Sequence, residues 1–184
     1  NSAKVQSVMT KHTISVAKSL EKKGLIYISL AISGLGFNNS RRWAKKLGIQ
    51  KFNLQRRGCL GERMKRQILI NKRFCLRNKI KNIIFVGTDL PNLCHTDLLK
   101  TINELKKNDI ILGPSNDGGY WLIAFSEKIL STYLNLPFIN IKWSKENVLQ
   151  KTIDNFSSVK MKYNFLHKKI DLDTISDIEN SQFV

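Results

Sequence analysis

Short apolar runs alternate with amphipathic segments along this chain, and this alternation constrains the fold more than any other feature. The strand-like runs lie at 25–32, 82–87, 109–113, 120–125 and 161–166. Helical spacing of apolar side chains occurs at 3–20, at 60–76, and after Thr96 and Ser144. Strands that alternate with helices form a mostly parallel sheet covered on both faces. We therefore expect an α/β fold, a three-layer α/β/α sandwich.

Length and cysteine content indicate an ordinary intracellular domain. The chain has 184 residues, so we expect a single domain over residues 1–184. Cys59, Cys75 and Cys94 are odd in number and lack C-x-x-C spacing, which predicts reduced thiols in the cytoplasm. No apolar run approaches the ~20 residues of a transmembrane helix, so we expect no transmembrane segment. Residues 1–23 also lack the apolar stretch of a signal peptide.

The charge of the chain is unusual. Lys and Arg total 31 against 14 Asp and Glu, a formal net charge of +17. Residues 56–81 carry ten basic side chains and one acidic one, Glu62. Such a stretch is either a solvated basic helix or a surface for phosphates of nucleotides, nucleic acid or membranes. Its single aromatic residue, Phe74, offers little base stacking, so we expect anionic small molecules and no specific nucleic acid.

The first segment that could bind a ligand or take part in catalysis is FVGTDLP at 85–91. An apolar strand delivers Gly87, Thr88 and Asp89 to its carboxyl end, where ligands collect in α/β sheets. A carboxylate on a loop stiffened by Pro91 suits a hard cation that carries phosphates. Asp89 could equally be a turn residue before proline.

The second segment is GPSNDGGYW at 113–121. Gly118 and Gly119 allow a close backbone approach to a ligand or a positive φ, and Asp117 precedes them. The same N-D-G-G run is strong turn chemistry between strands 109–113 and 120–125. Both interpretations can hold together.

The third segment is DLDT at 171–174. In an extended chain Asp171 and Asp173 point the same way, and their carboxylates repel unless a cation or base lies between them. Alternatively, Asp173 or Thr174 is the N-cap of a helix.

Taken in order, these segments resemble a bacterial family of glycosyltransferase-A-like proteins of long-uncharacterised function. That family shows G-T-D-x-P, G-P-x-x-D-G-G-Y, a tryptophan-containing segment and D-x-D-T-x-x-D. The matching positions here are 87–91, 113–120, Trp143 and 171–177, with Gln55, Gly58, Leu60, Gly61, Arg63 and Met64 upstream. The resemblance extends over residues 3–178.

The resemblance implies a transferase that uses a nucleotide-activated donor, in particular a nucleotide sugar. Mg²⁺ or Mn²⁺ would neutralise the departing diphosphate, with Asp89, Asp171 and Asp173 as metal ligands. Asp117 would be the catalytic residue, contacting the sugar or accepting the acceptor's proton. The positions assigned to donor binding are Gly87, Thr88, Arg63, Gly118, Gly119 and Tyr120. The acceptor and the oligomeric state stay open.

The sequence departs from the family pattern in two places. Cys59 stands where the family usually has an acidic residue. The family also opens with a strand and a basic, glycine-containing loop that grips the nucleotide, and this sequence starts after that point, at Asn1. Either the sequence is N-terminally incomplete or the protein lacks a normal donor site, and in both cases we expect a fold without this first strand and loop.

Two other functions are compatible with these residues. One is a nucleotidyltransferase that resembles the phospholactate and molybdenum-cofactor guanylyltransferases. In the phospholactate enzymes Thr-Asn follows the double glycine, whereas Tyr120 and Trp121 follow it here, which favours the glycosyltransferase-like family. The other is a truncated or degenerate, non-catalytic domain that binds anions through its basic face.

Overall fold

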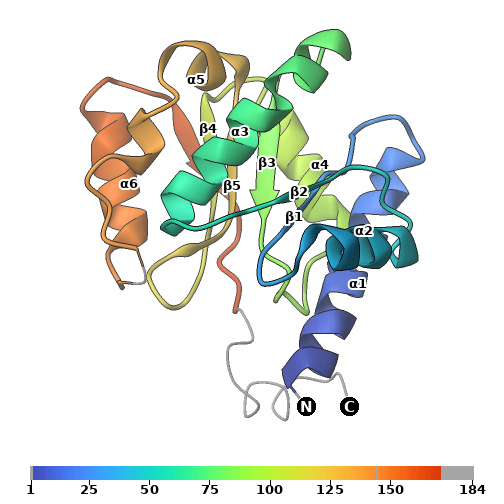
Figure 1. Ribbon diagram of the computed structural model, residues 1–184. Coiled ribbons are helices and arrows are strands. Elements are labelled where there is room, and N and C mark those ends of the chain that lie inside the picture. The colour runs from blue at the N-terminus through green and yellow to red at the C-terminus, as the bar shows by residue number, and fades with distance from the viewer. Residues whose placement is uncertain (1, 144, 171–184) are drawn as a thin grey trace.

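Helices cover both faces of a central sheet in the computed structural model, which describes residues 2–143 and 145–170 and confirms the three-layer α/β/α architecture (Figure 1). The helices are α1 (Ser2–Glu21), α2 (Phe37–Lys46), α3 (Leu60–Arg77), α4 (His95–Glu104), α5 (Glu127–Thr132) and α6 (Val148–Ser157), with a 3₁₀ turn at Leu136–Phe138. The strands are β1 (Leu30–Ile32), β2 (Phe52–Leu54), β3 (Ile83–Val86), β4 (Ile110–Pro114), β5 (Tyr120–Phe125) and β6 (Tyr163–Phe165).

The larger sheet has the strand order β3-β5-β4-β6. β4 and β6 are parallel, and β5 is antiparallel to both β3 and β4. β3, β4 and β6 therefore point the same way, with β5 reversed between two of them, so the expected mostly parallel sheet is confirmed. The β4–β5 connection is a hairpin, in which the Ser115 N–H donates to the Gly119 carbonyl over 3.1 Å. The turn interpretation of this segment is therefore confirmed as well.

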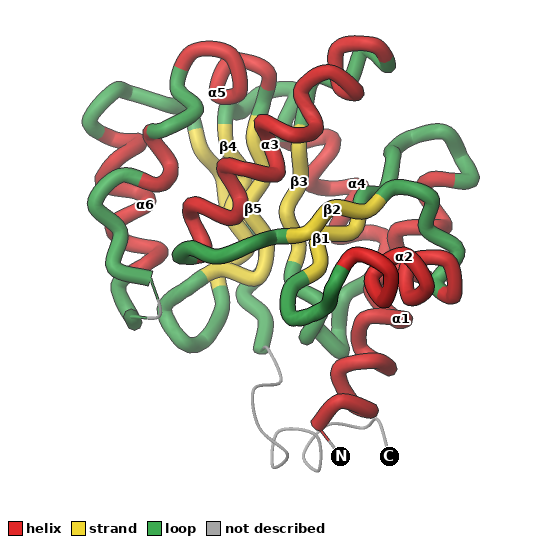
Figure 2. Tube along the Cα trace, viewed as in Figure 1, coloured by secondary structure: helices red, strands yellow, loops and turns green. Residues whose placement is uncertain are grey.

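Alternate residues of the central strands feed two separate cores, as the two-residue period of a strand requires. Ile111 packs with α1 and α4 on one face, whereas Ile110 and Leu112 pack with α3, α5 and α6 on the other. Figure 2 shows α3 crossing one face of the sheet, with α4 on the opposite side. Both faces are apolar, which explains why the sequence of these strands is almost continuously hydrophobic.

A second, two-stranded parallel sheet consists of β1 and β2. It lies beside the larger sheet, because α1 and α3 contact both. α1 contributes Ile14 to the core around β1 and Leu20 to the core under the larger sheet. α3 packs Met64 on the larger sheet, while its Gln67 side chain donates to the Leu54 carbonyl of β2 over 3.4 Å. Within the described residues no hydrogen-bonded ladder joins β1 to β3.

Four local features differ from the sequence prediction. The expected strand at 25–32 is regular only from Leu30, and β2 and α5 were not expected. The helix expected after Thr96 begins one residue before it, at His95, and its N-cap residue is Cys94. The Asp97 carboxylate accepts the Cys94 N–H over 2.9 Å and takes the capping role instead. None of the helices in the described part of the chain is long and apolar enough to span a membrane.

Candidate functional site

Three loops meet at one edge of the larger sheet. They are the β3–α4 loop (87–94), the β4–β5 turn (115–119) and the segment after β6 (166–170). Because β3, β4 and β6 point the same way, their carboxyl ends share that edge. Lys169 joins all three: its N–H donates to the Pro114 carbonyl over 3.1 Å, and its Nζ donates to the Asn92 carbonyl over 2.7 Å. Sequence segments far apart therefore form one candidate active site.

The β3–α4 loop presents Asp89 at the end of β3. The Gly87 N–H donates to the Trp121 carbonyl over 3.0 Å, which continues the β3–β5 ladder. A Cβ on Gly87 would lie 2.6 Å from Asp89 Oδ1, so a glycine there lets the carboxylate fold back over the strand end. Leu90 is fully buried while Asp89 is exposed and Thr88 half-buried. The buried leucine thus anchors a loop whose acidic residue is exposed.

The β4–β5 turn fixes the carboxylate of Asp117. Its Oδ1 accepts hydrogen bonds from the Ser115 hydroxyl and, over 2.9 Å, from the Gly119 N–H. Ser115 is buried, whereas Asp117 is exposed. Among the described residues Oδ2 accepts no hydrogen bond. Oδ1 therefore sets the orientation of the Asp117 carboxylate.

The local structure explains why position 118 is a glycine. Its φ is +83°, and a Cβ would overlap the backbone of Glu146. Its carbonyl accepts the Leu149 N–H of α6 over 2.9 Å. The bare backbone of Gly118 is thus packed against the protein's own 146–149 segment, and the donor contacts expected for Gly118 and Gly119 stay predictions.

Tyr120 and Arg63 lie at the side of this edge where α3 begins. The Tyr120 ring meets the Trp143 ring edge-on, with centroids 6.5 Å apart, and Trp143 covers Gly61 so closely that a Cβ there would lie 2.5 Å from the indole. The Tyr120 hydroxyl is buried, and burial raises its pKa. Arg63 donates through Nε to the Gly58 carbonyl over 2.8 Å. The upstream motif therefore joins the hairpin through Trp143.

Lys169 and Asp97 belong to this site and were not anticipated from the sequence. Lys169 Nζ lies 2.9 Å from an Asp97 oxygen and 5.4 Å from the centre of the Trp121 ring, and both charged side chains are largely buried. The Trp121 indole donates to the His167 carbonyl over 3.2 Å. These contacts hold the segment after β6 against the β3–α4 loop. No motif marks the pair, because its members come together only in the folded chain.

The Lys169–Asp97 pair predicts a pH dependence of stability. Burial acts to raise the pKa of Asp97, but hydrogen bonds from the Cys94 N–H and from Lys169 outweigh it and hold the pKa below the usual 3.8. A depressed pKa stabilises the fold above the unfolded value and loses that effect as pH falls through the folded one. Asp97→Asn should therefore flatten the decline in urea-unfolding free energy below about pH 4 and cost about 1–3 kcal/mol at neutral pH. If the free energy of unfolding of the variant declined below pH 4 as steeply as that of the native protein, the stabilising role of the Asp97 carboxylate would be contradicted.

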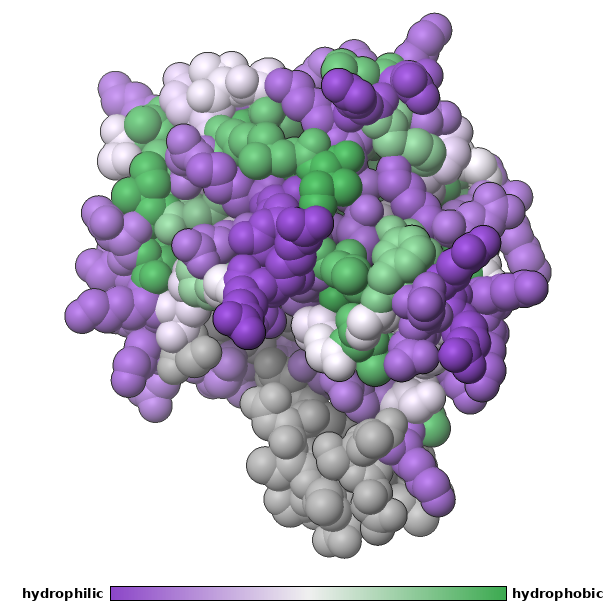
Figure 3. All heavy atoms as spheres, in the orientation of Figure 1, coloured by the Kyte–Doolittle hydropathy of each residue, from purple (hydrophilic) through white to green (hydrophobic). Residues whose placement is uncertain are grey.

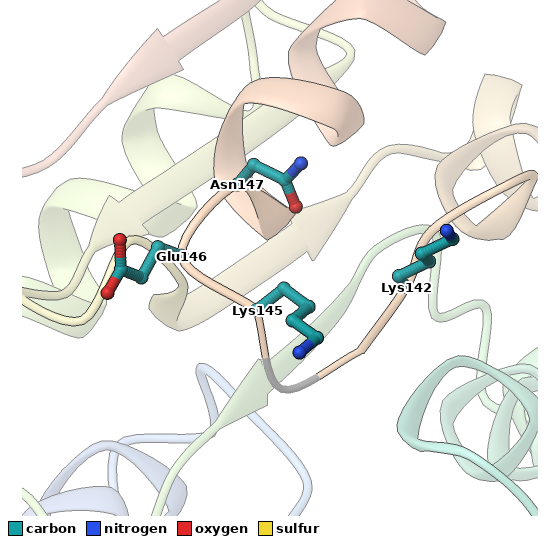
Figure 4. A pocket seen from close by; sticks show the side chains of 4 residues that line it. All are labelled: Lys142, Lys145, Glu146 and Asn147. Atoms are coloured by element: carbon teal, nitrogen blue, oxygen red, sulfur yellow. The ribbon is translucent and has the colours of Figure 1, made fainter.

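Two lysines that sequence reasoning missed flank the rim of the site. Lys142, Lys145, Glu146 and Asn147 line an open depression of about 630 Å³ beside the β4–β5 turn (Figure 4). In this view Lys145 and Asn147 point towards Lys142, whereas Glu146 points away. The only available signal was the pair of lysines around Trp143 in the sequence.

Of the three predicted metal ligands, the structure describes only Asp89. Asp171 and Asp173 lie outside the described residues. Within residues 2–143 and 145–170 no group of three His, Cys, Asp or Glu side chains could hold a metal ion. The carboxylates of Asp89 and Asp117, on exposed loops at one sheet edge, are hard oxygen donors of the kind that Mg²⁺ and Mn²⁺ prefer. The donor chemistry fits such an ion, and the metal-ligand role of Asp89 stays a prediction.

Residues 16–145 match a family described as "Uncharacterized protein conserved in bacteria (DUF2064)". The match covers more than half of the chain and includes both the Asp89 loop and the Asp117 turn. The chain belongs to this family. A search of proteins with curated functions finds no match.

Three solved structures illustrate the fold that this chain shares with other proteins. A proposed nucleotide-diphospho-sugar transferase from Desulfovibrio desulfuricans is 24% identical, with a TM-score of 0.75 over 96% of this chain and 77% of its own. A 4-diphosphocytidyl-2C-methyl-D-erythritol synthase from Anaerococcus prevotii is 15% identical, with a TM-score of 0.65 over 94% of this chain and 83% of its own. A cytidylyltransferase from Leptospira borgpetersenii is 15% identical, with a TM-score of 0.54 over 82% of this chain and 65% of its own. These likenesses establish the fold.

Proposed function

We propose that the protein is a metal-dependent transferase that uses a nucleotide-activated donor, and that the donor is a nucleotide sugar. The observation that carries this proposal is the meeting of the Asp89 loop, the Asp117 turn and the Lys169 segment at the carboxyl ends of three strands. Ligands of open α/β sheets bind at that edge. The fold shared with the Desulfovibrio protein supports the choice of donor.

Asp89, Asp171 and Asp173 are the proposed ligands of Mg²⁺ or Mn²⁺. The described chain contacts the β3–α4 loop, which carries Asp89, at Lys169, and Asp171 follows two positions later in the sequence. When bound, the metal would neutralise the negative charge that develops on a departing diphosphate. Grouped carboxylates repel one another without a cation, so metal binding should also stabilise the fold.

Asp117 is the proposed catalytic residue. Its Oδ1 is held by Ser115 and Gly119, so Oδ2 has a fixed direction in which to accept a hydrogen bond or a proton from an acceptor hydroxyl. A carboxylate fixed before the reaction needs little reorganisation in the transition state, which favours catalysis.

The groups proposed to bind the donor are backbone atoms and cationic side chains around this edge of the sheet. Gly87, Thr88 and Gly119 offer backbone at the strand ends, Tyr120 continues the turn, and Arg63 lies at the start of α3. Lys142 and Lys145, beside the β4–β5 turn, add positive charge for a diphosphate. These lysines extend the set of residues expected from the sequence.

A nucleotidyltransferase is the second candidate, because two of the structures with this fold are cytidylyltransferase-type enzymes. The two functions differ in the bond that breaks: a glycosyltransferase releases a nucleoside diphosphate or monophosphate, whereas a nucleotidyltransferase releases pyrophosphate from a nucleoside triphosphate. A domain that binds anions without catalysis is the third candidate, and the same experiment separates it from both.

Thermal unfolding with nucleotides and nucleotide sugars, each with and without Mn²⁺, tests the proposal. A saturating donor at about 100 times its Kd should add about 2.7 kcal/mol of stability, a rise in Tm of roughly 5–10 °C. The rise should require metal and exceed that given by inorganic phosphate. Equal stabilisation by phosphate alone, without metal, would favour the anion-binding domain. A response to nucleoside triphosphates but not to nucleotide sugars would favour the nucleotidyltransferase.

A further inference from the structure

The outward side of α3 combines exposed aliphatic side chains with a group of cations. Leu69, Ile70 and Leu76 are 50%, 48% and 70% exposed. The cations of this surface are Lys65, Arg66, Lys72, Arg73 and Arg77. The opposite side of the helix buries Met64 and Ile68 in the core. We refer to the three aliphatic residues and five cations together as the α3 outer face.

Helical geometry places these residues on one surface. Leu69, Arg73 and Leu76 follow the i, i+4, i+7 spacing of one side of a helix, and Ile70, Arg73 and Arg77 follow i, i+3, i+7. Figure 3 shows apolar surface over α3 interrupted by strongly hydrophilic side chains. Tyr27 lies beside the same helix, with its ring edge-on to Phe74 at 5.5 Å and 58% of the residue exposed.

Within the described residues, salt bridges do not balance the charge of this surface. Glu62 is the single acidic residue of α3, and its carboxylate caps the helix by accepting the Cys59 N–H over 2.8 Å. In the described part of the chain no α3 cation takes part in a salt bridge. Arg66 donates to the carbonyls of Gln55 and Arg57, which leave its positive charge in place.

We propose that the α3 outer face docks on the surface of a bilayer that contains anionic lipids. A helix that presents aliphatic side chains among lysines and arginines can bury the former at the headgroup boundary while the latter contact lipid phosphates. The 18 residues of α3 would lie along the membrane plane over roughly 27 Å. This inference is independent of the transferase chemistry, which lies at the carboxyl ends of the strands.

The observations favour a bilayer over the other occupants. A nucleic acid offers phosphates but no partner for Leu69 and Leu76, and the Phe74 ring is occupied by Lys51, whose Nζ lies 3.2 Å from the ring centre, and by Tyr27. A second copy of this chain would bring two basic faces together within a protein of net charge +17.

Vesicle sedimentation tests the proposal, with phosphatidylcholine alone and with a phosphatidylcholine–phosphatidylglycerol mixture. The protein should bind the anionic mixture, with an affinity that falls as salt is added. Arg73→Gln with Arg77→Gln should weaken binding about 30-fold, since each cation near an anionic surface contributes roughly fivefold. Leu69→Ser with Leu76→Ser should weaken it about tenfold or more at unchanged charge.

Matched controls lie on the other side of the molecule. Lys106→Gln with Lys107→Gln removes the same charge after α4, and Val8→Ser removes an exposed aliphatic side chain from α1; both should change vesicle binding by less than about twofold. Circular dichroism and thermal melting confirm that each variant folds. Equal losses in the two charge variants, or full binding by the leucine variant, would overturn the proposal. So would arginine variants that weaken duplex RNA binding more than vesicle binding, because the surface would then serve nucleic acid.

Discussion

Asp89→Asn should abolish metal-dependent stabilisation and reduce turnover by at least about 100-fold, while the metal-free fold keeps its stability or gains slightly. The amide has nearly the shape of the carboxylate, so the fit over Gly87 is kept. It lacks the negative charge that a hard divalent cation requires. Removing one charge from a group of carboxylates also relieves their mutual repulsion in the absence of metal.

The measurement is the Mn²⁺-induced rise in Tm of the variant and of the native protein. Asp154→Asn is the matched control, because Asp154 is an exposed carboxylate on α6 whose 3.8 Å contact to Lys151 is a surface ion pair of small energetic value. The control should respond to Mn²⁺ as the native protein does. A full response by the Asp89 variant would show that Asp89 is not a metal ligand. The proposed donor would then be tested only by thermal unfolding with nucleotides and nucleotide sugars.

The fold was largely predictable because it follows from periodicity. The apolar runs at 82–87, 109–113 and 120–125 became β3, β4 and β5, whose two faces pack in separate cores. β2 was not predicted, because its three residues, Phe52–Leu54, contain a single period of apolar and polar alternation. Short strands form through pairing with a neighbour, and that pairing is not encoded in local sequence.

For the candidate site, the positions of single segments could be predicted from the sequence, whereas contacts between distant segments could not. The Asp89 loop and Asp117 turn lie at the sheet edge expected from their positions after strands. The Lys169–Asn92 contact joins residues 77 positions apart, and nothing in either segment marks it. Gly118 is a case in which the sequence suggested a contact that the structure gives to another group. Its N-D-G-G context suits close approach of a ligand to the backbone, whereas in this structure the backbone of Glu146 lies there.

Gly118→Ala should lower the free energy of unfolding by about 3 kcal/mol or more, which corresponds to a fall in Tm of roughly 6–12 °C. Two costs add at this position. A φ of +83° is strained for any residue with a Cβ, by roughly 1–2 kcal/mol. The new methyl group would also overlap the Glu146 backbone, which cannot move aside without breaking the hydrogen bond from Leu149 to Gly118.

Two other glycines separate these costs. Gly24 has a φ of +70°, and nothing lies within 4 Å of the position that an alanine methyl group would take, so Gly24→Ala should show the backbone strain alone, about 1 kcal/mol. Gly36, the N-cap residue of α2, has neither a positive φ nor a neighbour within 4 Å. Gly36→Ala should be close to neutral, because the poorer N-cap and the lower entropy of the unfolded chain roughly offset each other. Urea unfolding of the three variants should rank Gly118→Ala as the least stable, far below Gly24→Ala, with Gly36→Ala the most stable. Equal losses of stability in Gly118→Ala and Gly24→Ala would contradict this account. The β4–β5 turn would then not be packed against Glu146 in solution, and the backbone of Gly118 would be accessible to a ligand.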